Sequence, residues 1–162
     1  GPREVEQAVL EYQRLFGGEA LEAALAGLRR NAVEAMRVLA PFRPRLVGPV
    51  LSGTAGPDSR VTLHVFTDTP EEVGLALEEA GIPGRLGSAR LRDFHGEGRD
   101  YPRFAFVAGR CEIEAVVFPE VQFRHAPPDP VDGRPMARAD IDAVRRLLEQ
   151  DEAGSATRGA DA

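Results

Sequence analysis

The hydrophobic pattern of the chain changes its period at a proline-containing stretch, residues 41–44. Before it, residues 19–40 carry apolar side chains three and four positions apart, which predicts an amphipathic helix. After it, residues 61–66 (VTLHVF) alternate strictly, which predicts a β-strand with two distinct faces. The chain is therefore expected to combine helices with a sheet.

The segments on either side of this change extend the predicted order of elements. Residues 3–16 repeat the helical spacing and join 19–40 in a helical N-terminal part over 3–40. Thr69 as N-cap and Pro70 are typical of a helix start, and Gly81 is typical of its end. The other predicted elements are strands at 45–51, 85–94, 102–108 and 111–118 and a C-terminal helix at 139–152 capped by Asp140.

Short turns between the later strand candidates, such as Gly109-Arg110, favour a mixed or antiparallel sheet over a doubly wound parallel one. We therefore expect an α+β fold, with a mixed sheet of about five strands in 45–118 packed with N-terminal, central and C-terminal helices. The length suits a single domain, which we place at 3–153. Residues 154–162 are small and polar, and we expect a disordered tail there.

The composition excludes several classes of function. All 20 basic residues are arginine, which excludes chemistry that needs a lysine amine. The formal net charge of -6 argues against general nucleic-acid binding, and no apolar run approaches the ~18 residues of a membrane span. The single cysteine, Cys111, lies in an apolar strand candidate, so we expect a buried thiol and a cytoplasmic protein.

The most informative stretch is 46–66, with Gly48, the run Gly53-Thr54-Ala55, the run Pro57-Asp58-Ser59 and then the strand. This series resembles the signature region of the nucleotidyltransferase superfamily, which includes small bacterial nucleotidyltransferases. That region contains a strand, Gly-Ser, a helical turn, a Gly-Thr-Ala-like run, Asp-Ser, and an Asp-x-Asp motif opening the next strand. The resemblance covers about residues 30–118 and implies a nucleotidyltransferase-like fold.

The resemblance also implies a chemistry. The family's glycine lets the backbone approach a triphosphate, and three carboxylates hold magnesium ions that neutralise the phosphates. Glu114 matches the third carboxylate, but Pro49 replaces the serine, and Arg60 and Thr62 stand at the two aspartate positions. A guanidinium ~4 Å from a dication repels it by roughly 8 kcal/mol at an effective dielectric near 20. We therefore expect a degenerate motif with no metal site and no magnesium cofactor.

A ligand cleft is predicted between strands 45–51, 61–66 and 111–118. There, Arg60 either binds a phosphate group directly or closes the site by an ion pair with Glu114. The catalytic candidates are Glu114 and His64, although a histidine on a strand is more often a hydrogen-bonded structural residue. The predicted ligand-binding residues are Gly48, Gly53, Thr54, Arg60, Thr62 and Glu114.

Other charged residues have simpler interpretations. Asp58 is expected to be a turn residue, and Asp68 is expected at the entry to the central helix. Four arginines near 85–108 are expected to form a solvated charged edge strand rather than an anion-binding surface, because acids are interleaved with them. They are Arg90, Arg92, Arg99 and Arg103.

Three functions remain open. The first is a nucleotidyltransferase-fold protein that serves as a non-catalytic nucleotide-binding, phosphate-binding or regulatory module. The second is an active nucleotidyltransferase with a non-standard site built from Glu114 with Asp58 or Asp68, the one case that needs magnesium. The third is a structural or protein-interaction domain that forms a homodimer through helix 19–40.

Overall fold

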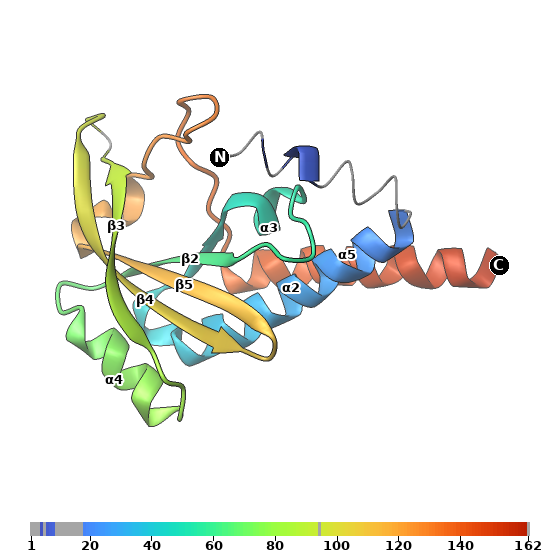
Figure 1. Ribbon diagram of the computed structural model, residues 1–162, viewed down its shortest axis with the longest axis horizontal. Coiled ribbons are helices and arrows are strands. Elements are labelled where there is room, and N and C mark those ends of the chain that lie inside the picture. The colour runs from blue at the N-terminus through green and yellow to red at the C-terminus, as the bar shows by residue number, and fades with distance from the viewer. Residues whose placement is uncertain (1–3, 5, 9–17, 94, 162) are drawn as a thin grey trace.

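The computed structural model describes residues 4, 6–8, 18–93 and 95–161 (Figure 1). Over these residues the protein is an α+β fold built on a five-stranded mixed sheet with the strand order β1-β2-β5-β4-β3. The strands are β1 (Arg45–Val47), β2 (Val61–Phe66), β3 (Arg85–Arg92), β4 (Gly98–Ala108) and β5 (Cys111–Phe118). The expected mixed sheet is therefore confirmed.

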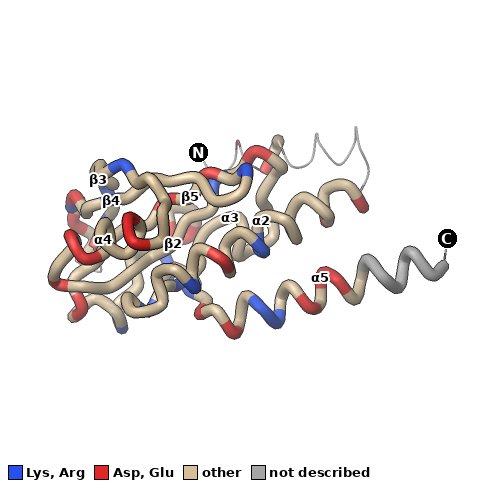
Figure 2. Tube along the Cα trace, turned by 90° about the horizontal axis from the view of Figure 1, so that it is seen from below, with Lys and Arg blue, Asp and Glu red and all other residues tan. Residues whose placement is uncertain are grey.

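Helices cover one face of this sheet. The long helices α2 (Gly18–Val38) and α5 (Ile141–Asp161) lie side by side, and α4 (Glu71–Glu79) covers the part of the sheet near β3 and β4 (Figures 1 and 2). Three short helical segments complete the fold: η1 (Ala40–Phe42), α3 (Gly48–Ser52) and η2 (Glu120–Arg124). The helix expected over 3–16 lies outside the described residues, apart from residues 4 and 6–8, which are helical.

The register of the central strands decides which side chains meet. β2 pairs in parallel with β5, so that Thr62 lies opposite Glu114. β1 pairs antiparallel with β2, and β4 pairs antiparallel with both β5 and β3. The hairpin between β4 and β5 turns through Gly109, whose φ of 65° suits glycine, so the predicted Gly109-Arg110 turn is confirmed.

The two faces of the sheet are covered differently. Side chains of β2 at 61, 63 and 65 pack with α2 and α4 in the main core, as their alternation predicts. On the other face, Phe66, Tyr101, Val116 and Phe118 form a small aromatic cluster that packs against Phe123 of η2. We call this second side the open face, because helices do not cover the end of it that carries Thr62 and Glu114.

The strand predicted over 45–51 is shorter than expected, because β1 ends at Val47. Gly48 follows with a φ of 75°, and Pro49 lacks the N–H that a strand ladder needs, so the chain turns into α3. Thr69 also differs from expectation. Its hydroxyl lies 3.2 Å from the Thr67 hydroxyl and makes no cap bond, and Pro70 occupies the cap position of α4.

The C-terminal helix is longer than predicted. Asp140 caps it as expected, because its Oδ1 accepts a hydrogen bond of 2.9 Å from the backbone N–H of Ala143. We expected the helix to end at 152, with a disordered tail over 154–162, but α5 continues to Asp161. Residues 153–161 contain no proline and three alanines, which permits this extension, although Gly154 and Gly159 each disfavour a helix by about 1 kcal/mol relative to alanine.

Candidate functional site

Three of the predicted site residues meet on the open face. Nη1 of Arg60 lies 3.3 Å from Oε2 of Glu114, and the Thr62 hydroxyl donates to Oε1 of Glu114 over 3.2 Å. The Glu114 side chain is 17% exposed, whereas that of Arg60 is half-exposed. The expected ion pair between Arg60 and Glu114 is therefore present, at the place where the resemblance puts a metal ion.

Two further charged residues extend this group. Nη1 of Arg103 lies 3.6 Å from Oε2 of Glu114, and Nη2 of Arg60 lies 3.5 Å from Oε2 of Glu112. We had assigned Arg103 to a charged edge strand, but it lies on the inner strand β4, and its guanidinium reaches Glu114. Only the strand register brings these residues together, so sequence spacing alone does not reveal the group.

A glycine on the neighbouring strand leaves room for Arg103. Gly87 pairs with Arg103, and a Cβ at Gly87 would lie 3.1 Å from Nη2 of Arg103. Nε of Arg103 is buried and has no hydrogen-bond partner within the described chain. One edge of the guanidinium thus lies against the sheet with part of its hydrogen-bonding capacity unused, while the side chain as a whole is 34% exposed.

A pocket of about 470 Å³ opens beside these residues. Its charged lining consists of Arg60, Arg85, Arg103 and Glu112, and its apolar lining includes Phe106 and Ile113. Three guanidiniums face two carboxylates when Glu114 is included, so the local charge is positive in a protein whose formal net charge is -6. Such a pocket suits an anionic ligand better than a cation.

The remaining charged groups do not build a metal site. Within the described residues, no group of three or more His, Cys, Asp or Glu side chains is arranged to hold a metal ion. Oδ1 of Asp68 accepts a hydrogen bond of 3.1 Å from the backbone N–H of Glu120, which lies past the far end of β2. Asp58 lies in an exposed turn and lines a different pocket from Arg60.

The glycine-rich segment is divided between the two ends of α3. Gly48 follows Val47, which pairs with Thr62, so Gly48 lies at the edge of the site. Gly53 ends α3 with a φ of 88°, and the Thr54 hydroxyl lies 2.9 Å from that of Ser52. Gly53 and Thr54 therefore lie at the end of α3 opposite to Gly48.

A buried arginine that we did not predict holds α3 in place. Arg29 of α2 donates from Nε to the carbonyl of Val50 over 3.0 Å and from Nη2 to that of Leu51 over 2.9 Å. Its Nη1 lies 3.0 Å from Oδ2 of Asp151 in α5. Arg29 thus satisfies carbonyls at the end of the short helix and links three helices.

His64 lies on the same face of β2 but does not reach the pocket. Its side chain is 1% exposed, and its Nδ1 accepts a hydrogen bond of 3.0 Å from Nε of Arg138. Burial, with a contribution from the charge of Arg138, lowers the pKa of His64 to about 3. A neutral, enclosed imidazole fits the structural interpretation of His64 better than the catalytic one.

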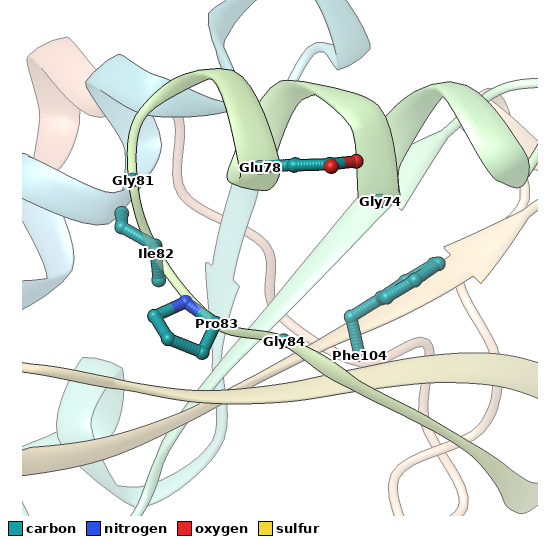
Figure 3. A pocket seen from close by; sticks show the side chains of 7 residues that line it. All are labelled: Gly74, Glu78, Gly81, Ile82, Pro83, Gly84 and Phe104. Carbon is teal, nitrogen blue, oxygen red and sulfur yellow. The ribbon is translucent and has the colours of Figure 1, made fainter.

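A second pocket lies between α4 and the start of β3 (Figure 3). Its volume is about 390 Å³, and its lining includes three glycines, the ring of Phe104 and one charged residue, Glu78. It contains none of the predicted site residues. Because Glu78 is its only charged group, this pocket has no cation for a phosphate and no carboxylate pair for a metal.

No protein-family model matches the chain, and no curated protein matches its sequence significantly. A solved structure of a cytoplasmic RNA terminal U-transferase is similar, with a TM-score of 0.41 and 14% identity over 71% of this chain. The similar region spans 34% of that protein's length. Within the described residues, no helix is long and apolar enough to cross a membrane.

Proposed function

We propose that this protein is a nucleotidyltransferase-like domain that binds the phosphate group of a nucleotide through arginine side chains, without a metal ion and without nucleotidyl transfer. The observation that carries the proposal is the pocket beside Arg60, where the guanidiniums of Arg60, Arg85 and Arg103 outnumber the two carboxylates of Glu112 and Glu114. A guanidinium there supplies positive charge permanently and repels a divalent cation.

The ion pairs of this site leave the arginines available to a ligand. Their N···O distances of 3.3 Å, 3.5 Å and 3.6 Å exceed the 2.7–2.9 Å typical of strong charge-assisted hydrogen bonds. The Arg60–Glu112 pair, whose side chains are 49% and 69% exposed, contributes only about 0–1 kcal/mol. A phosphate group can therefore replace the Glu112 contact of Arg60 at little cost and gain contacts from Arg85 and Arg103 across the pocket.

The two alternatives have less support. An active transferase needs a second carboxylate next to Glu114. Asp58 lines a different pocket, and Asp68 accepts a hydrogen bond from Glu120 past the far end of β2. Self-association through helix 19–40 needs an exposed apolar stripe, but the apolar side chains of α2 that include Leu21, Leu28 and Met36 are buried against the rest of the chain. Both alternatives remain outcomes of the experiment below.

Thermal unfolding with ATP, GTP, CTP and UTP, each with and without magnesium, tests the proposal. We expect at least one nucleotide to raise Tm without magnesium, and Arg60→Gln with Arg103→Gln to remove most of that shift. The control is Arg92→Gln, on the exposed edge strand. Stabilisation that requires magnesium would favour the transferase, and an unchanged Tm with every nucleotide would contradict phosphate binding.

A further inference from the structure

A second group of arginines lies on the open face, toward the aromatic cluster. Arg45 pairs with His64 on β2, four residues beyond Arg60, which separates the two groups by about 13 Å along the strand. Arg43 precedes Arg45, and Arg138 reaches the same place from the segment before α5. We call Arg43, Arg45 and Arg138 the second arginine group.

Each of these three guanidiniums contacts an aromatic ring of the same cluster. The Cζ atoms of Arg43 and Arg45 lie 4.1 Å and 4.8 Å from the ring centre of Phe123. Cζ of Arg138 lies 4.9 Å from the ring centre of Phe66, and the Phe66 and Phe123 rings are themselves 5.0 Å apart. Stacking leaves the N–H edges of a guanidinium free to bind an acceptor in its plane.

No carboxylate compensates this charge. Within the described residues, none of the three arginines forms an ion pair, although eight other arginines do. The acceptors of Arg45 and Arg138 are the backbone carbonyls of residues 43, 44, 122 and 123 and the uncharged ring of His64. Nη2 of Arg138 is buried and has no partner in the described chain.

The structure maintains this arrangement at an energetic cost. Burial, followed by repulsion from Arg45, lowers the pKa of Arg138 to about 10. Arg43 has a φ of 50°, and it is the one non-glycine residue in the described chain with a positive φ. A left-handed conformation costs an arginine roughly 1–2 kcal/mol. Here it ends η1, where the backbone N–H of Arg43 donates to the carbonyl of Ala40 over 3.3 Å.

We propose that the second arginine group binds a phosphate or diphosphate group of a soluble ligand, at a site separate from the Arg60 pocket. A doubly charged phosphate oxyanion offsets the repulsion between Arg45 and Arg138 and accepts in-plane hydrogen bonds from Arg43 and Arg45. The inference does not depend on the proposed function, because it involves none of the residues of the Arg60 pocket.

Isothermal titration with pyrophosphate at low ionic strength tests this inference. In a protein that already carries Arg60→Gln with Arg103→Gln, we expect Arg43→Gln with Arg45→Gln to weaken pyrophosphate binding at least tenfold, and Arg92→Gln to leave it unchanged. Arg60→Gln with Arg103→Gln should preserve the site at Arg43 and Arg45. Pyrophosphate binding that is equal in this background with and without the Arg43 and Arg45 changes, or absent from the background protein itself, would overturn the inference.

The stability of the free protein provides a second readout. If the second arginine group is an empty anion site, removal of two of its charges should leave Tm unchanged or raise it at low salt. If the three arginines serve only to hold η2 in place, the same variant should have a lower Tm at low salt, which would contradict the inference. A failure of the proposed function would instead show as nucleotide binding that is insensitive to Arg60 and Arg103.

Discussion

Arg29 of α2 and Asp151 of α5 form a bifurcated ion pair, in which Nη1 of Arg29 lies 3.1 Å from Oδ1 and 3.0 Å from Oδ2 of Asp151. Arg29 is buried, so loss of its partner leaves a charge with little access to water. We expect Asp151→Ala to lower the free energy of unfolding by about 1–3 kcal/mol, and Arg29→Ala to lower it by about 3–5 kcal/mol.

Urea denaturation measures both effects. The neighbouring pair Arg30–Glu152 offers a matched control, because its atoms are 3.9 Å apart and both side chains are exposed. Glu152→Ala should change the free energy of unfolding by less than about 0.5 kcal/mol. Equal effects of Asp151→Ala and Glu152→Ala would show that burial of Arg29 does not matter.

If Arg60 and Thr62 stand where the family has aspartates, restoring aspartate at both positions should create a metal-binding site. Arg60→Asp combined with Thr62→Asp places two carboxylates next to Glu114 on adjacent strands. We expect the double variant to bind Mn²⁺ with a Kd of about 0.1–1 mM, because hard oxygen ligands then surround the site. Calorimetry on the native protein and on Arg60→Ala with Thr62→Ala provides the comparison, and no uptake by the folded aspartate variant would contradict the assignment of the site.

His64 predicts a dependence of stability on pH. Its pKa is about 3 in the folded protein and near 6.5 when the chain is unfolded, so the unfolded chain binds the proton more strongly between these values. Stability is therefore complete above pH 6.5 and falls as the pH is lowered toward 3, by about 1.4 kcal/mol per unit from this group. Urea denaturation at pH 7.5, 6 and 5 should show a smaller fall for His64→Gln, which keeps an acceptor for Arg138.

If His64→Gln and the native protein lost stability in parallel between pH 6.5 and 5, His64 would not be a buried neutral group.

Cys111 should be unreactive in the folded protein. Its thiol is buried, and burial raises its pKa, so the nucleophilic thiolate is rare at neutral pH. Reaction with a disulfide reagent should be slow in buffer and complete within minutes in 6 M guanidinium chloride. Rapid labelling of the folded protein would show that the hairpin of β4 and β5 opens readily.

Sequence patterns predicted the faces of the central strands well. The alternation of Val61, Leu63 and Val65 fixes which side of β2 faces the main core, and the same period in β5 places Glu114 beside Thr62 once the two strands pair. The sequence did not predict that β1 ends at Val47, because the apolar residues Val50 and Leu51 fit a strand as well as a helical turn.

The rest of the site depends on contacts between distant segments. The position of Arg103 depends on the register of three strands and on the absence of a side chain at Gly87. Arg29 reaches acceptors 21 and 122 positions away, so its place in an amphipathic helix gives no sign of its role. The second arginine group likewise requires η2 to fold back over the sheet, which no local pattern predicts.

The parallel pairing of β2 with β5 has a consequence for synthesis on the ribosome. Thr62 is made 52 residues before Glu114, and at 5–20 residues per second the interval is roughly 3–10 s. During that time Arg60 and the apolar strand around it have no neighbour on this side, because the closing strand does not yet exist. The pocket beside Arg60 therefore cannot form before the β4–β5 hairpin leaves the exit tunnel and docks.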